Sequence, residues 1–244
     1  MLLQIGDRAV TPAEIIPMLA GYQLLPQLWR EIVLDKVSSS IKLSSSEQAI
    51  AIEQYYQKYQ IINISERQAY LQHYGMSGCQ LEELAIRESK IEKFKIVTWE
   101  NKLESFFLSH KSKLDKVIYS VLRTREPELA QELYFRIQAK EQSFADCAAQ
   151  YSQGVEAQTS GLIGPVELSI PHPKLAKMLT VSKPGQLLPP TRLGDWFLVV
   201  RLEKFIPAVF DEVMRQRLLN QLFKQWLNEQ INQISLVEQA PVTL

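Results

Sequence analysis

The sequence predicts an α+β protein. We expect a helical N-terminal bundle, a small antiparallel or mixed sheet with surrounding helices, and a long C-terminal helix that packs back on the helical part. Of the 9 Gly and 12 Pro, eleven lie between Gly154 and Gly194, whereas Gln27–Glu126 contains no Pro and only two Gly. A long helix-permissive half followed by a turn-rich stretch excludes a repeat solenoid, a βαβ nucleotide-binding fold and an all-β sandwich. A second observation is the change from helical to strand-like hydrophobic spacing near residue 115.

The chain begins with a short strand and turn at residues 3–10, followed by a helix. Thr11 and Glu14 can form a capping box, which places the start of that helix. Pro17 and Pro26 are expected to bend or break it, because proline lacks the backbone donor that a helix interior needs.

Three further helices are expected in this half. A serine-rich linker at 38–46 ends in a second capping box, formed by Ser44 and Glu47, and Ser65 is expected to cap a third, short helix. The longest helix is expected at Cys79–His110, where apolar residues recur at helical spacing. A stripe of that length has to be covered by other helices, so we expect a bundle.

From residue 115 the expected order of elements is β–α–α–β–α–β, a compact α+β domain. The elements are a strand at Lys116–Arg123, helices at Pro127–Ala139 and after Ser143, a strand at Leu162–Leu168, a helix at Pro173–Leu179 and a strand at Trp196–Glu203. Lys183–Gln186 fits a type II turn. A last helix begins after Asp211, and its wide apolar stripe indicates burial. The predicted domains are a helical domain at 1–114, a sheet domain at 115–206 and a docking helix at 207–244.

Charge and cysteine content narrow the function classes. Lys+Arg and Asp+Glu both number 27, and a net charge of zero argues against nucleic acid or an anionic membrane surface as the partner. No apolar run approaches the roughly 18 residues of a membrane span.

Cys79 and Cys147 are expected to be reduced thiols, and no HxH, CxxC or HExxH motif predicts a metal site. The N-terminus lacks the pattern of a signal peptide, so we predict a cytoplasmic location.

Residues 116–204 resemble the parvulin (PpiC-type) peptidyl-prolyl isomerase domain in five segments that follow the family order. These are VIYSVL, ELAQELYFRIQAKEQSFADCAAQYS, SGLIGPVE, HPKLAKML and KPGQLLPPTRLGDWFLVVRLE. The helical flanks resemble SurA- and PrsA-like chaperones in their architecture. The resemblance implies a foldase or chaperone that acts on unfolded or Pro-containing polypeptides and needs no cofactor.

The resemblance also implies where the site lies. Parvulins combine an apolar cup for the proline ring with two histidines and a Cys or Asp near the substrate carbonyl. Here the first His position falls on Ser120 and the Cys or Asp position on Gly154. The second His position falls on Trp196, or on Phe197 if the gap is placed differently. The residues expected to form the cup are Ile163, Ile170, Leu175, Leu179, Trp196 and Phe197. The histidines present in the chain, His73, His110 and His172, lie elsewhere.

Two functions remain open at this point. One is a parvulin-type isomerase with a degenerate polar site; the other is a non-catalytic chaperone or adaptor that binds Pro-containing client segments, with a link to protein export. Loss of a hydrogen bond worth roughly 1–3 kcal/mol in the transition state lowers a rate roughly 5- to 150-fold, so the first reading predicts weak activity. The cup residues also fit a second interpretation, as ordinary core.

Overall fold

The chain folds into two compact units. The structure, a computed structural model, describes the backbone of residues 3–234 and the side chains of residues 6–234. Within these residues, the first unit comprises the chain up to Leu103 together with the part that begins at Glu212, and the second unit comprises Glu104–Asp211. The long helix α5 (Gly78–Leu114) belongs to both units. None of the helices within 3–234 combines the length and the apolar composition of a membrane span.

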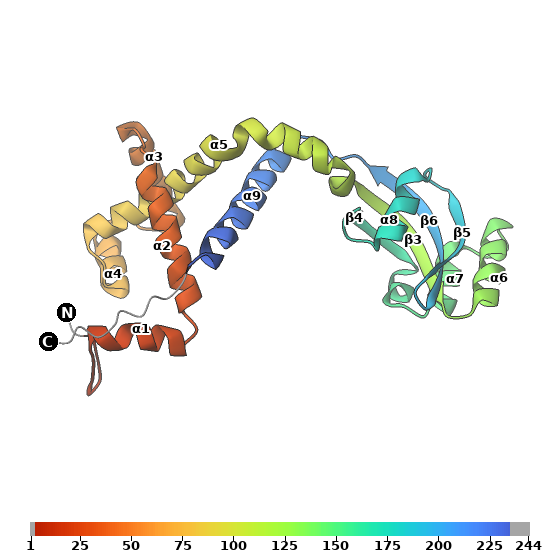
Figure 1. Cartoon of the computed structure of the whole chain (residues 1–244), viewed down its shortest axis with the longest axis horizontal. Coiled ribbons are helices and arrows are strands. Elements are labelled where there is room, and N and C mark those ends of the chain that lie inside the picture. The colour runs from red at the N-terminus through yellow and green to blue at the C-terminus, as the bar shows by residue number, and fades with distance from the viewer. Residues whose placement is uncertain (1–2, 235–244) are drawn as a thin grey trace. The chain divides into compact units, whose positions relative to one another are not determined.

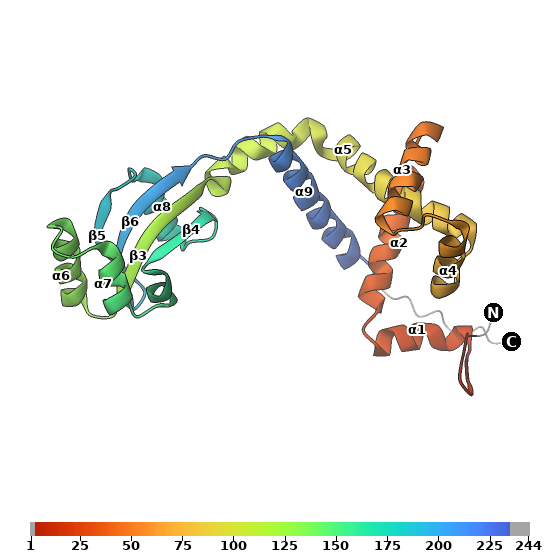
Figure 2. The ribbon, with the colours of Figure 1, turned by 180° about the vertical axis from the view of Figure 1, so that it is seen from behind.

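The first unit is helical. Its elements are β1 (Leu3–Ile5), β2 (Arg8–Val10), α1 (Pro12–Gly21), α2 (Leu25–Ser40), α3 (Ser45–Lys58), α4 (Ile64–Tyr74), the first part of α5, and α9 (Glu212–Asn232) (Figure 1). Helix α9 packs on α2, where Leu34 forms a buried cluster with Phe223 and Leu227. Phe94 of α5 adds edge-to-face contact with Phe223, with ring centroids 6.4 Å apart. Figure 2 shows the ribbons of α2, α5 and α9 from behind. The prediction that the C-terminal helix packs on the helical part is confirmed.

Two of the predicted helix starts are confirmed by their capping boxes. The Glu14 carboxylate accepts a hydrogen bond from the Thr11 backbone at 2.8 Å, and Glu47 accepts one from Ser44 at 2.7 Å. Each box satisfies backbone donors that have no partner within the helix. These local signals fix where α1 and α3 begin.

Other helix boundaries differ from the expectation. Helix α4 is capped by Asn63, whose side-chain oxygen accepts from the backbone of Glu66, so the predicted cap at Ser65 is wrong. Asn, like Ser, is a strong N-cap, and Glu66 three residues after Asn63 completes the box. Pro17 lies inside α1 and does not end that helix. Pro26 lies in the first turn of α2, where a missing N–H is tolerated. The break in the chain falls between the two helices, at residues 22–24.

The second unit is an antiparallel sheet with helices on both faces. Its strands are β3 (Lys116–Thr124), β4 (Leu162–Glu167), β5 (Leu187–Leu193) and β6 (Trp196–Ile206), in the spatial order β4-β3-β6-β5. Its helices are α6 (Pro127–Gln138), α7 (Phe144–Tyr151), the 3₁₀ turn η1 (Val155–Thr159) and α8 (Pro173–Val181). The α+β prediction is confirmed, with an additional strand, β5.

Strand β5 had no place in the expected order of elements. It contains Pro189 and Pro190 and lies at the edge of the sheet, where a missing backbone donor is tolerated. The turn before it agrees with the expectation: Gly185 has φ +82°, and the Gln186 amide donates to the Lys183 carbonyl at 2.9 Å.

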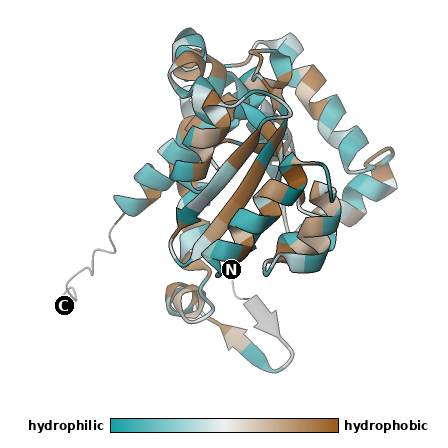
Figure 3. Ribbon diagram, turned by 90° about the vertical axis from the view of Figure 1, so that its right-hand side faces the viewer, coloured by the Kyte–Doolittle hydropathy of each residue, from teal (hydrophilic) through white to brown (hydrophobic). Residues whose placement is uncertain are grey.

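The two faces of the sheet bury different clusters. The α8 face contains Val117, Tyr119, Val121, Leu175, Leu179, Leu198, Val200 and Leu202. The opposite face, which α6 and α7 cover, contains Leu122, Ala130, Leu133, Phe144, Cys147 and Val199. Hydrophobic residues concentrate along the strands in Figure 3. Because both faces are covered, the central strands are apolar on both sides.

Candidate functional site

Ser120 lies on the sheet face that α6 and α7 cover. Its hydroxyl donates a hydrogen bond to Glu203 Oε1 at 2.5 Å. The same carboxylate oxygen accepts a hydrogen bond from Arg201 Nε at 2.8 Å. Side chains alternate along a strand, so Ser120 points away from the face on which its neighbour Tyr119 packs. Trp196 packs on the face of Tyr119. The structure therefore does not bring Ser120 together with Trp196.

The α8 face offers an apolar surface between α8 and the strands β5 and β6. A cavity of about 10 Å³ lies there, which is room for about one water molecule. Its lining residues are Lys174, Leu175, Met178, Thr191, Leu193, Leu198 and Val200.

The predicted cup residues are divided by the fold. Ile163 and Trp196 are partly buried on the α8 face, and Leu175, 7% exposed, belongs to the buried cluster of that face. Leu179, a residue of α8, is completely buried in the cluster of the α8 face. Phe197 packs on the opposite face of the sheet. Ile170 lies between β4 and α8 and is 71% exposed. Four of the six predicted cup residues thus lie on the α8 face, and of these only Ile163 and Trp196 are partly exposed.

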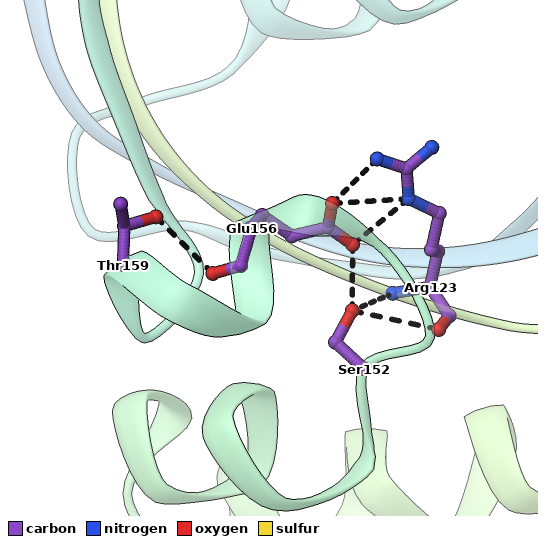
Figure 4. A network of polar contacts seen from close by, with 4 residues as sticks. All are labelled: Arg123, Ser152, Glu156 and Thr159. Atoms are coloured by element: carbon purple, nitrogen blue, oxygen red, sulfur yellow. Dashed lines mark hydrogen bonds and ion pairs between the residues drawn. The ribbon is translucent and has the colours of Figure 1, made fainter.

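A buried polar network lies at the end of β3, on three elements (Figure 4). The Glu156 carboxylate, from η1, accepts hydrogen bonds from Arg123 Nε at 2.9 and 3.0 Å and from its Nη2 at 2.5 Å. Ser152, at the end of α7, donates to Glu156 Oε1 at 2.6 Å and accepts from the Arg123 backbone amide at 3.0 Å. The Glu156 side chain is 0% exposed, whereas that of Arg123 is 34% exposed.

Gly154 lies directly against this network. A Cβ at this position would lie 2.1 Å from Arg123 Nε and 2.2 and 2.4 Å from the two carboxylate oxygens of Glu156. Such distances are far inside van der Waals contact, so only glycine fits while the ion pair keeps its place. The space beside the position expected for the family's Cys or Asp is therefore filled by the Arg123–Glu156 pair.

The electrostatics of the network favour the charged forms of both partners. Burial raises the pKa of the Glu156 carboxyl, but the hydrogen bonds from Arg123 and Ser152 outweigh it, so this pKa lies below its ordinary value. The hydrogen bond to Glu156 raises the pKa of Arg123. Burial, and then the negative charge of Glu156, raise the pKa of Tyr119. At neutral pH the site holds an ionised pair beside a neutral phenol.

Trp196 connects this network to the apolar surface. The Arg123 guanidinium carbon lies 5.7 Å from the centre of its ring, and that of Arg125 lies 5.0 Å away. Both distances suit cation–π attraction. The structure thus brings Gly154, Trp196 and the Arg123–Glu156 pair together at one edge of the α8 face.

Arg123, Ser152 and Glu156 were not among the residues expected from the sequence. Their pairing joins positions about thirty residues apart, and no local spacing reveals it. The available signal is Arg123 at the end of an apolar strand, where a charged side chain needs a partner. The histidines take no part: His172 caps α8, accepting from the Lys174 amide at 3.2 Å, and His110 stacks on Phe106.

Comparisons with known proteins agree with this reading of the second unit. Residues 122–204 match the family model of the rotamase, or PPIC-type PPIase, domain. No curated protein matches the chain. The match begins within β3 and ends within β6, so it includes the network and most of the residues of the α8 face.

Solved structures extend the likeness to the helical flanks. The crystal structure of the peptidylprolyl isomerase PrsA from Bacillus cereus is 17% identical, with a TM-score of 0.52 over 97% of this chain and 93% of that one. PrsA from Bacillus anthracis is 16% identical, with a TM-score of 0.48 over 87% of this chain and 100% of that one. At such identity, the Bacillus cereus match bears on the fold alone. The expected resemblance is confirmed at the level of the domain: residues 122–204 match the PPIC-type PPIase family model.

Proposed function

We propose that the second unit catalyses cis–trans isomerisation of Xaa-Pro bonds in polypeptides, as part of a parvulin-type foldase or chaperone. Rotation about the bond breaks amide resonance and meets a barrier of ~20 kcal/mol, but no covalent bond is cut. A site needs only to bind the prolyl ring and to favour the twisted amide over the planar one. The observation that carries the proposal is the isomerase-domain match, with a polar group adjoining an apolar surface within it.

The α8 face is the proposed place for the prolyl ring. Ile163 supplies partly exposed apolar surface, Leu175 lines the small cavity, and Trp196 adds an aromatic edge. The cavity there holds about one water molecule, so a ring has to displace a side chain. Met178 lines the cavity and is unbranched, so we expect it to make room.

A non-catalytic binding function is the second candidate. It is favoured because the three positions at which the family keeps polar catalytic side chains do not supply them to the α8 face in this chain. Ser120 is buried on the other face, Gly154 has no side chain, and Trp196 is aromatic. A domain of this kind would bind Pro-containing client segments without accelerating their isomerisation.

One measurement separates the two candidates. Exchange NMR on a short Ala-Pro peptide reports the cis–trans rate with and without the full chain. Accelerated exchange supports the isomerase. Unchanged exchange, together with binding of an unfolded protein, supports the binding module and contradicts the isomerase.

Ile163→Glu tests the location of the site under both candidates. A carboxylate on the apolar α8 face should abolish binding of a Pro-containing peptide, because burying an unpaired charge is costly. Val181→Glu is the matched control, since Val181 is 79% exposed at the end of α8. Titration calorimetry with one peptide measures both variants. Unchanged binding to the Ile163 variant would place the site elsewhere.

Polypeptide clients are the partners that this proposal implies. The cytoplasmic location remains a prediction, and fractionation of cells that express the native gene tests it. Recovery only from an extracytoplasmic fraction contradicts it.

A further inference from the structure

At the edge of the α8 face, beside Trp196, the guanidinium of Arg123 is a hydrogen-bond donor that an ion pair holds in a fixed position. We propose that Arg123 is a catalytic residue that donates a hydrogen bond to the prolyl nitrogen as the Xaa-Pro bond twists, replacing the polar side chains that the family places elsewhere. This inference rests on the proposed isomerase function. It names the group that lowers the barrier, and Glu156 and Ser152 are then positioning residues.

The chemistry of the twisted amide decides what a donor can do. In the planar bond the nitrogen lone pair is delocalised into the carbonyl, so the nitrogen is a poor acceptor. Rotation localises the lone pair on nitrogen, which then accepts a hydrogen bond. A donor placed at that atom binds the transition state better than either ground state, which is the condition for catalysis.

Arg123 has donors left for this role. Its ion pair with Glu156 uses Nε and Nη2. Figure 4 shows the second terminal nitrogen of the guanidinium without a contact, and within residues 6–234 no hydrogen bond engages Nη1. A guanidinium has five N–H donors, so the pair with Glu156 leaves Nη1 to a ligand. The Arg123 side chain is 34% exposed, so part of it is open to a ligand.

The surroundings of Arg123 hold the guanidinium in one orientation. Glu156 is completely buried and is itself fixed by the Ser152 hydroxyl. Trp196 lies against the guanidinium on another side, at 5.7 Å. A donor that is already oriented loses little entropy and needs no reorganisation during the reaction.

The position of the guanidinium agrees with the proposal independently of its orientation. Arg123 Nε lies 2.1 Å from where a side chain would begin at Gly154, the position at which the resemblance places an acid or thiol. The Arg123 guanidinium therefore provides a hydrogen-bond donor beside Gly154, a residue that has no side chain of its own. Arg125 provides a comparison: it lies over the same Trp196 ring, but no ion pair with a carboxylate fixes it within the described residues.

The test compares Arg123→Gln with Arg125→Gln in the full chain. Exchange NMR over a range of Ala-Pro peptide concentrations gives kcat and KM for each. We expect Arg123→Gln to lower kcat at least about tenfold with little change in KM, since the lost bond forms only in the transition state. Arg125→Gln should change kcat less than about twofold.

Two further variants guard against loss of the fold. Arg123→Met combined with Glu156→Leu replaces the pair by apolar groups, a change that buried ion pairs often tolerate. It should fold, as judged by urea unfolding, and lose kcat to the same extent. Glu156→Gln keeps an acceptor for Arg123 and should lower kcat less than Arg123→Gln does.

The outcomes distinguish this inference from the function on which it rests. A wild-type chain that accelerates exchange and a folded Arg123→Gln variant with unchanged kcat overturn the role of Arg123 alone. Equal losses of kcat in the Arg123 and Arg125 variants also overturn it, because they indicate a general charge effect. A wild-type chain that binds the peptide without accelerating exchange overturns both proposals.

Discussion

Gly154 and the Arg123–Glu156 pair constrain each other at the scale of single residues. Gly154 has φ −108° and ψ 175°, a conformation open to any residue, so its backbone does not demand glycine. Glycine is required for steric reasons, because the ion pair occupies the space that a Cβ would take. The same contact excludes a Cys or an Asp there.

Gly154→Ala should therefore destabilise the second unit by about 1–3 kcal/mol, the usual cost of overpacking. Urea unfolding measures the difference. The control is Gly21→Ala, because Gly21 ends α1 and has no atom within 4 Å of its Cβ position. That change should cause no loss, since alanine is favoured in helices. Equal destabilisation of both variants would contradict the steric argument.

Glu156 gives the stability of the protein a defined dependence on pH. Its folded-state pKa lies below the ordinary value, so it stabilises the folded state above the unfolded pKa of about 4.3. That contribution is lost as pH falls through the folded-state pKa. At pH 7, Glu156→Gln should cost about 1–3 kcal/mol, because it weakens a buried hydrogen-bonded pair.

The gap in unfolding free energy between wild type and Glu156→Gln should narrow as the pH is lowered below about 4.3. Glu14 and Glu47 also have lowered pKa values, but both are present in each protein and cancel in the comparison. Urea unfolding at a series of pH values gives the gap. A gap independent of pH would show that ionisation of Glu156 does not contribute.

The candidate site could be predicted from the sequence only in part, for a physical reason. Trp196 and Leu175 were assigned through the family resemblance, since they lie in the matching segments KPGQLLPPTRLGDWFLVVRLE and HPKLAKML. Ser120 could not be assigned to a face, because β3 is apolar on both sides and a pattern without alternation does not reveal which residues face α8. The Arg123–Glu156 pair depends on the tertiary fold and has no local signal.

Elements with strong local signals were the ones that could be predicted. The capping boxes at Thr11 and Ser44 fix two helix starts with side chains alone. Strand β5 was missed because its two prolines resemble a turn, and only its place at the edge of the sheet makes them acceptable. Prediction thus worked where the stabilising contact is within a few residues.

Helix α8 shows the difference between lining a site and supporting it. Leu179 is 0% exposed, so Leu179→Ala should cost about 2–5 kcal/mol of stability through the cavity it leaves. KM for a Pro-containing peptide should stay the same below the unfolding transition. The control is Val181→Ala on the same helix, expected to stay within about 0.5 kcal/mol of wild type. A raised KM with unchanged stability would return Leu179 to the substrate surface.

The whole molecule is organised around a helical unit that the chain completes only after the sheet unit. A chain ending at Asp211 lacks Phe223 and Leu227, which cover Leu34 of α2. Amide hydrogen exchange should then show lost protection in α2 and retained protection in β3 and β6. A chain ending at Ile234 is the control, since it keeps all of α9. Full protection of α2 in the shorter chain would contradict the dependence.

The helical unit is formed by two separate parts of the chain, and this sets an order of folding events during synthesis. Chains emerge from the ribosome N-terminus first, and domains generally fold as units. The sheet unit can close once Asp211 has emerged, whereas α2 must wait for α9 with Leu34 uncovered. For that interval we expect the nascent protein to present an apolar helix face of its own, and so to share the exposure of an unfolded client until its last helix arrives.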